Sequence, residues 1–248
     1  MNNPWLMAIA LNSILLIVAA IIPKKLLTTA GLINAWGLGV VIWGTLGWRG
    51  YAVVMFYFLV GSGVTRIGMA QKEAEGIAEK RGGARGAENV WGSSFTAALC
   101  ALGIAGIAQG YVGVEWYSLL LLGYVASLAT KLSDTTASEV GKAYGKRTFL
   151  ITTLQPVARG TEGAVSLEGT IAGIVGGLMI SLVAYGLGLI SLSGLVICSI
   201  AAFVATNIES VIGATLQDKF DWLTNELVNA INTMIGAVVA ISISILWH

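Results

Sequence analysis

The sequence is poor in the residues that carry metal-bound and nucleophilic chemistry in many enzymes. Its single histidine is residue 248, so an HExxH metal site is excluded and a triad with a histidine base is not expected. Its two cysteines, Cys100 and Cys198, fall inside apolar runs, where we expect small, buried side chains and no disulfide. Any bound metal is therefore expected to have oxygen ligands.

Charged residues are also scarce. They make up 11% of the 248 residues, whereas 56% are hydrophobic and the mean hydropathy is +0.82. Soluble domains carry about 25% charged residues. The formal net charge of +1 gives no basic field, so nucleic acid is excluded as a partner. Because the apolar runs match a hydrocarbon core of roughly 30 Å, we predict an all-α, polytopic membrane protein. Residues 1–248 are expected to form a single transmembrane helical domain among membrane lipids.

About eight transmembrane helices are predicted, at residues 4–22, 31–48, 51–69, 88–108, 116–138, 170–189, 192–212 and 227–247. Only Arg49 and Gly50 separate the second span from the third. This predicts a tight helical hairpin in which Gly50 takes a positive φ. The first span lacks a preceding basic segment and is followed by Pro23, Lys24 and Lys25, so we interpret it as a retained helix and not as a cleaved signal peptide.

Basic residues are concentrated in alternate connections. Those after spans one, three, five and seven hold Lys24, Lys25, Lys72, Lys80, Arg81, Arg85, Lys142, Lys146, Arg147, Arg159 and Lys219. The opposite connections hold only Arg49. By the positive-inside rule, the four basic connections face the cytoplasm and both termini face the other side. An active site in these connections would share a compartment with nucleotides.

The most densely charged stretch lies between residues 131 and 169. Five of its residues share one face of an ideal helix, namely Lys131, Asp134, Thr135, Ser138 and Lys142. A carboxylate between cations, with hydroxyls beside it, suits a polyphosphate bound to Mg²⁺. An intrahelical ion pair that lets Asp134 enter the membrane explains the same spacing. Glu139 lies about 140° around the helix from Asp134, so it would join the same ion only if the helix ended there.

Other spans also bring polar groups to the predicted cytoplasmic side. Arg66 lies near the predicted cytoplasmic end of span three, where snorkelling to the interface is an alternative to a functional role. Arg85 and Asn89 flank the start of span four, where free N–H groups can bind an anion, although capping by Asn89 is a simpler explanation. Glu209 lies near the end of span seven. Span eight begins with Asn225 and Asn229, for which interhelical hydrogen bonds are the alternative.

The connection after span five contains glycine and basic residues. Lys146 belongs to GKAYGKR at 141–147, which is not a Walker A loop because its glycines have the wrong spacing and no Ser or Thr follows the lysine. Arg159, Thr161 and Ser166 lie among glycines, which allow close approach to a phosphate. A solvated loop is the alternative. We favour function, because a connection of about 31 residues is long for a compact domain.

Several motifs carry a family resemblance: DTTASEVG at 134–141, YGK at 144–146, PVARGTEG at 156–163 and SLEGT at 166–170. Together with RGAENVWGSS at 85–94 and NIESVIGATLQ at 207–217, they resemble the integral-membrane family that includes the plant and cyanobacterial phytyl-phosphate kinases. A more distant likeness exists to dolichol kinases and CDP-diacylglycerol synthases. Span eight differs from the synthases, because asparagines stand in place of their metal-binding aspartates.

The resemblance implies transfer of the γ-phosphoryl group of CTP to an isoprenyl monophosphate. Phytyl phosphate would become phytyl diphosphate, for tocopherol and prenylquinone synthesis. The implied cofactor is Mg²⁺, and the implied partners are CTP, the isoprenyl phosphate lipid and membrane lipids. The implied location is a plasma or thylakoid membrane of cyanobacterial type, and a homodimer is compatible with the sequence.

Each candidate residue has an expected role under this hypothesis. The expected catalytic residues are Asp134, Lys142 and Arg159. The expected nucleotide and phosphate ligands are Lys131, Thr135, Ser138, Lys146, Thr161 and Ser166. The acceptor phosphate is expected to meet Arg66, Arg85, Asn89, Asn225 and Asn229. The expected metal ligands are Asp134, Glu139 and Glu209.

Two alternative functions are kept. A lipid-phosphate transporter would also need charges within the membrane, but transporters often contain paired repeats, and none is evident in this sequence. A cytidylyltransferase or a prenyl alcohol kinase of the same superfamily would use the same kind of site. The cytidylyltransferase would release pyrophosphate from CTP, whereas a kinase would release CDP.

Overall fold

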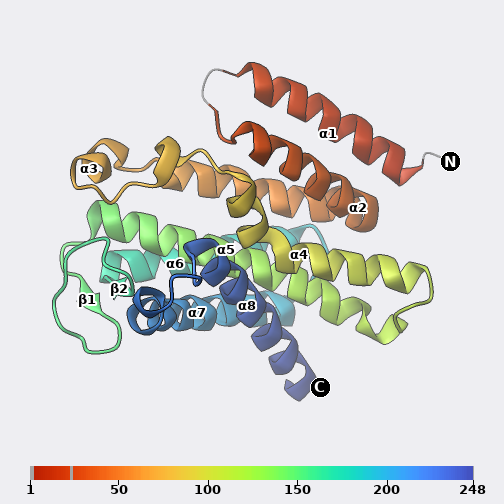
Figure 1. The fold of residues 1–248 in the computed structure, drawn as a ribbon. Helices are drawn as coiled ribbons and strands as arrows, with labels where there is room; N and C mark the ends of the chain where they lie inside the picture. The colour runs from red at the N-terminus through yellow and green to blue at the C-terminus, as the bar shows by residue number, and fades with distance from the viewer. Residues whose placement is uncertain (1–2, 23–24, 248) are drawn as a thin grey trace.

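The computed structural model describes residues 3–22 and 25–247, with the side chain of residue 218 left out. Its helices are α1 (Pro4–Ile21), α2 (Thr29–Thr65), α3 (Met69–Ala74), α4 (Ala87–Ala108), α5 (Tyr117–Tyr144), α6 (Leu167–Gly186), α7 (Leu192–Thr215) and α8 (Asn225–Trp247) (Figure 1). Short 3₁₀ turns η1, η2 and η3 lie at Lys80–Gly83, Val114–Trp116 and Gln217–Lys219. The predicted all-α membrane class is confirmed. Pro23, Lys24 and His248 lie outside the described residues.

The helix α2 folds back on itself at Gly47, where φ is 64° and ψ is −163°. A straight helix of 37 residues would be about 55 Å long. Yet the Arg66 guanidinium, just after α2, donates a hydrogen bond of 3.3 Å to the Lys25 carbonyl, just before it. The two halves are therefore antiparallel neighbours (Figure 1). The predicted hairpin exists, but its turn lies at Gly47 and Gly50 remains helical.

Six of the described helices are long and apolar enough to cross a membrane: α1, α2, α4, α6, α7 and α8. The predicted fifth span forms α5, whose composition is too polar for it to be counted with them. Since α2 consists of two antiparallel halves, the number of helices and the number of crossings differ. The count of about eight crossings stays a prediction.

The helix α5 occupies the centre of the bundle. Its residues 121–136 are buried without interruption, and it packs against α2, α4, α6, α7 and α8. Glycines bring the backbone of α6 close to it: a Cβ atom at Gly169 would lie 2.6 Å from the Ala137 carbonyl oxygen, and one at Gly176 would lie 2.4 Å from Thr136 Oγ1. Small residues of this kind allow close helix packing in membranes. The polar side chains of α5 are therefore held inside the protein.

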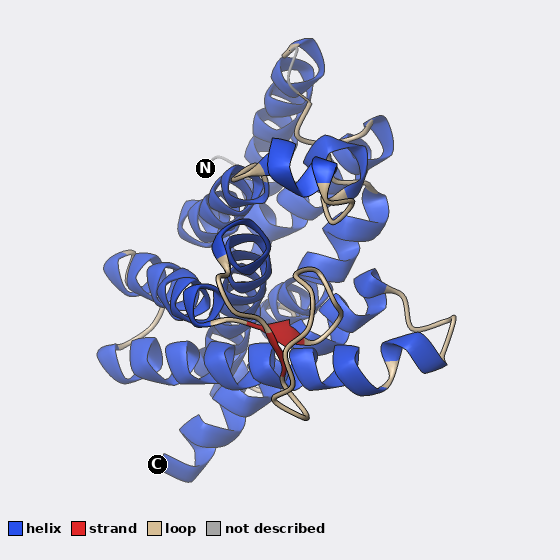
Figure 2. Ribbon diagram, turned by 90° about the vertical axis from the view of Figure 1, so that its left-hand side faces the viewer, coloured by secondary structure: helices blue, strands red, loops and turns tan. Residues whose placement is uncertain are grey.

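The connection between α5 and α6 carries the two short strands β1 (Phe149–Leu150) and β2 (Ala164–Val165). They pair antiparallel, with Phe149 opposite Val165 and Leu150 opposite Ala164. Figure 2 shows them among the helix ends at one end of the bundle, and Figure 1 shows α3 at that same end. The connection is shorter than predicted, because α5 continues as a helix to Tyr144.

Candidate active site

A cavity of about 700 Å³ opens at this end of the bundle. Its walls come from α4 to α8, from the segment between α3 and α4, and from the β1–β2 connection. Its volume lies in the usual range for small-molecule sites, about 300–1,000 Å³. Most of the predicted site residues line it: Arg85, Asn89, Lys131, Asp134, Thr135, Ser138, Glu139, Lys142, Thr161, Ser166, Glu209, Asn225 and Asn229.

Three predicted site residues do not line the cavity. Arg66 is bonded to the backbone between α1 and α2, as described above. Lys146 is exposed beyond the end of α5. The Arg159 guanidinium lies 2.5 Å from the Glu75 carboxylate, just after α3, and donates a hydrogen bond of 3.4 Å to the Ala143 carbonyl. The connection after α5 thus directs Arg159 toward α3 and away from the cavity wall.

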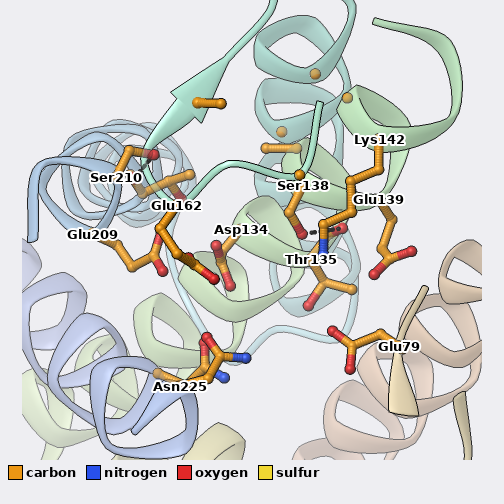
Figure 3. A pocket seen from close by; sticks show the side chains of 18 of the residues that line it. Glu79, Asp134, Thr135, Ser138, Glu139, Lys142, Glu162, Glu209, Ser210 and Asn225 are labelled. Atoms are coloured by element: carbon orange, nitrogen blue, oxygen red, sulfur yellow. Dashed lines mark hydrogen bonds between the residues drawn. The ribbon is translucent and has the colours of Figure 1, made fainter. Parts of the chain in front are cut away.

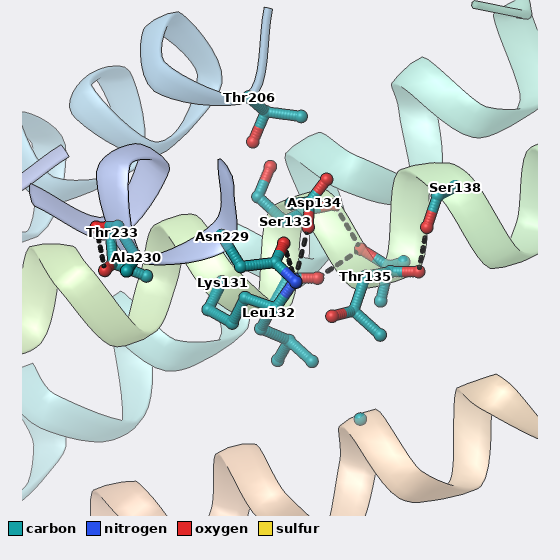
Figure 4. A network of polar contacts seen from close by, with 12 residues as sticks. Lys131, Leu132, Ser133, Asp134, Thr135, Ser138, Thr206, Asn229, Ala230 and Thr233 are labelled. Atoms are coloured by element: carbon teal, nitrogen blue, oxygen red, sulfur yellow. Dashed lines mark hydrogen bonds and ion pairs between the residues drawn. The ribbon is translucent and has the colours of Figure 1, made fainter. Parts of the chain in front are cut away.

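A buried polar network belongs to the cavity wall, and Figure 4 shows its contacts. The Lys131 ammonium is 2.5 Å from the Asp134 carboxylate, one turn along α5, and 2.7 Å from Asn229 Oδ1 on α8. Each of the three residues is 7% exposed. Charges inside membrane proteins are usually paired in this way, since an isolated ion is costly there. The intrahelical ion pair considered from the spacing therefore exists, and Asp134 lines the cavity as well.

Carboxyl groups from three elements converge beside this network. Glu209 on α7 interacts with the Asp134 carboxyl, and Figure 3 shows Glu162 from the β1–β2 connection pointing into the same space. Like charges this close favour a cation or a proton between them. Among residues 3–22 and 25–247, no group of three or more His, Cys, Asp or Glu side chains could by itself hold a metal ion. Asp134 and Glu209 form a partial oxygen-ligand set, which Mg²⁺ typically completes with phosphates and water.

Glu139 has a different partner from the one considered in the sequence. Because α5 remains helical beyond it, its carboxylate turns away from Asp134 and forms an ion pair with Lys72 of α3. The two side chains are 2% and 0% exposed, and Lys72 also donates a hydrogen bond of 2.8 Å to the Thr65 carbonyl. The sequence did not predict Lys72 as the partner of Glu139, because the two residues are 67 positions apart. It predicted Lys72 only as one of the basic residues in the connection after span three.

Arg85 is a cation of the cavity whose side chain and backbone are both held in place. Its guanidinium donates a hydrogen bond of 2.6 Å to the Tyr57 hydroxyl and lies 5.2 Å from the centre of that ring. Its backbone pairs with Leu26 and Thr28 through hydrogen bonds of 3.0 Å each. Arg85 and Lys142 form no ion pair with any described carboxylate, whereas Arg81 pairs with Glu88. Arg85 and Lys142 are therefore among the positive groups of the cavity that remain available to an anion.

Two further atoms of the cavity wall are buried without a hydrogen-bond partner in the described part of the chain. They are Thr206 Oγ1 on α7 and Gln217 Oε1 in η3. Buried polar atoms are normally bonded, so an orphaned one calls for an explanation such as water or a ligand. Figure 4 shows Thr206 on the side of Asp134 that faces α7, and Thr206 lies one turn before Glu209 on that helix, so its unpartnered hydroxyl belongs to the same part of the cavity wall as these two carboxyl groups.

The chain has relatives in bacteria, plants and archaea. A membrane protein of Synechocystis sp., described as uncharacterized, is 67% identical and covers 97% of this chain and 91% of its own. The chloroplastic protein VTE6 of Arabidopsis thaliana is 42% identical, over 96% of this chain and 71% of its own. An uncharacterized membrane protein of Methanocaldococcus jannaschii is 31% identical, over 93% of this chain and 91% of its own.

No solved structure matches the chain. A family model described as integral membrane protein DUF92 matches residues 12–237. The resemblance to plant and cyanobacterial membrane proteins, predicted from the motifs, is thereby confirmed. The chain belongs to the DUF92 family of integral membrane proteins.

Proposed function

We propose that this protein is a membrane phosphotransferase that moves the γ-phosphoryl group of CTP to an isoprenyl monophosphate. Phytyl phosphate would give phytyl diphosphate, used in tocopherol and prenylquinone synthesis. The identity to VTE6 supports an isoprenoid-related membrane activity. The observation that carries the proposal is the Lys131–Asp134 pair on the wall of a polar cavity that also holds Arg85 and Lys142.

The nucleotide half of the site would be formed by α5 and α7. Asp134 and Glu209 offer hard oxygen ligands that fit Mg²⁺, which when bound neutralises charge on the nucleotide phosphates. Lys131 holds the Asp134 carboxylate in place, and Lys142, about two turns beyond Asp134 on α5, neutralises phosphate charge. The hydroxyl of Thr135 lines the same wall. In this proposal the cavity end of the bundle faces the cytoplasm, where CTP is present.

The acceptor half would lie across the cavity. Arg85 has a planar guanidinium suited to bidentate contact with phosphate, and Asn89, Asn225 and Asn229 add hydrogen-bonding groups to the wall of the same cavity. A phosphate acceptor is already anionic, so transfer needs positioning and charge neutralisation more than a general base. This agrees with a site built without histidine.

The acceptor role of Arg85 can be measured directly. Arg85→Gln is expected to raise the KM for phytyl phosphate by about 10- to 100-fold, because a charge-assisted hydrogen bond contributes roughly 1.5–3 kcal/mol. The KM for CTP should change much less. Arg66→Gln is the matched control, because Arg66 bonds to the backbone outside the cavity and should leave both KM values within a factor of two. Equal effects of the two variants would contradict the assignment.

The reaction itself is tested with the purified protein in detergent. Incubation with labelled CTP, Mg²⁺ and phytyl phosphate should yield CDP and phytyl diphosphate, and chelation of Mg²⁺ should stop the reaction. Release of pyrophosphate would favour a cytidylyltransferase, and turnover with free phytol alone would favour a prenyl alcohol kinase. If no product forms but reconstituted vesicles carry the lipid phosphate across, the transporter alternative holds.

A further inference from the structure

Part of the cavity wall carries exposed apolar side chains. Two large apolar residues line the cavity and are also widely exposed: Ile174 on α6 is 47% exposed and Phe203 on α7 is 41% exposed. Both lie in helices that are long and apolar enough to cross a membrane. Along this part of the wall, the surface that faces the cavity therefore continues into the surface that would face hydrocarbon.

Close packing occurs on both sides of this part of the cavity wall. On one side α6 and α7 touch, since a Cβ atom at Gly177 would lie 3.1 Å from the Cβ of Ala202. On the other side Gly163, just before β2, packs on α7, where an added Cβ would lie 2.6 Å from the Ser210 carbonyl oxygen. Between these contacts α6 and α7 line the cavity. We call the part of the cavity wall that holds Ile174 and Phe203 the α6–α7 window.

The polarity of the lining changes across the window. Thr206 and Asn207 lie on α7 about one turn from Phe203 and line the cavity, and Thr206 is the residue with the unpartnered hydroxyl near Asp134. Outside the window the neighbouring side chains on the same helices are apolar, with Ile171 54% exposed and Ile200 48% exposed. A molecule with a polar head and an apolar tail would match this gradient.

We propose that the α6–α7 window admits the hydrocarbon chain of the acceptor lipid. The phosphate would lie inside the polar cavity, and the chain would pass between Ile174 and Phe203 into the bilayer. This inference rests on the proposed function, since it assigns a path to that acceptor. The chain then stays in an apolar environment throughout, so only the phosphate has to enter the polar cavity.

Tryptophan substitutions in the window test the path. Ile174→Trp and Phe203→Trp should raise the KM for phytyl phosphate at least tenfold and change the KM for short-chain dimethylallyl phosphate less than twofold. Ile171→Trp and Ile200→Trp are matched controls, because they place the same bulk on the same helices outside the cavity wall. They should behave like the unaltered protein. An unaltered KM for phytyl phosphate in both window variants would overturn the proposal.

A second measurement does not depend on turnover. A prenyl phosphate with a photoreactive diazirine in its tail should label peptides that contain Ile174 or Phe203, and excess phytyl phosphate should suppress the labelling. Labelling confined to other helices would overturn the window. If the unaltered protein makes no phytyl diphosphate, the proposed function fails. If it is active but the window variants and the labelling show no effect, only the window fails.

Discussion

Asp134→Asn is expected to lower the rate of phosphoryl transfer by on the order of 10³-fold, the scale seen when a preorganised electrostatic group is removed from an active site. The carboxylate pairs with Lys131, interacts with Glu209 and lines the cavity, so its charge serves every proposed contact with a metal-bound nucleotide. Asparagine retains the shape and an oxygen acceptor for the lysine. The variant should therefore remain folded while losing activity.

Activity and folding have to be measured on the same preparation. Turnover of CTP with phytyl phosphate gives the first, and thermal unfolding in detergent gives the second. Glu115→Gln is a suitable control, since it removes one exposed carboxylate in η2 at the start of α5 and should change turnover less than twofold. Near-normal turnover by Asp134→Asn would contradict the assignment of the nucleotide site to this face of α5.

Lys72→Met is expected to lower the free energy of unfolding by about 3–5 kcal/mol, the usual cost of removing one partner from a buried ion pair. The variant would leave the Glu139 carboxylate, which is 2% exposed, without its counter-charge. It would also remove the hydrogen bond to the Thr65 carbonyl that ties α3 to the end of α2. The double variant Lys72→Met/Glu139→Leu should regain most of the lost free energy of unfolding, because both buried charges are then absent.

The comparison requires a second ion pair of the same region. Glu75→Gln breaks the pair with Arg159, whose side chains are 34% and 28% exposed, and should cost less than about 1 kcal/mol. Unfolding by denaturant in detergent would give both values. A loss for Lys72→Met no larger than that for Glu75→Gln would show that the buried pair does not anchor α3.

The transmembrane helices could be predicted because their signal is local. Apolar runs limited by glycine and charged residues predicted α4 at 88–108 and α7 at 192–212, and the observed helices begin and end within a few residues of these limits. The face of α5 that holds Lys131 and Asp134 was also predictable, since it depends only on helical spacing. The position of the α2 turn was less so, because five glycines occur between residues 37 and 50 and any could have formed it.

Features that depend on tertiary contacts could not be predicted. The pairing of Glu139 with Lys72 joins residues from two helices across 67 positions, and neither residue has a local pattern that marks the other. Arg159 appeared to be a phosphate ligand because glycines surround it, yet the folded connection carries it to Glu75. The α6–α7 window had no signal in the sequence, since Ile174 and Phe203 resemble every other apolar residue of their helices.

The central position of α5 has a consequence for the biogenesis of the protein. Lipid alone cannot solvate the charged half of this helix, and the Lys131 ammonium finds its amide partner, Asn229, on a helix that the ribosome completes after α6 and α7. During synthesis the polar side chains of α5 therefore need a protected environment, such as that of the insertion machinery, until α8 has been made. A nascent chain interrupted before α8 would leave Lys131 without Asn229. Membrane quality control recognises unpaired polar groups of this kind and degrades the proteins that expose them.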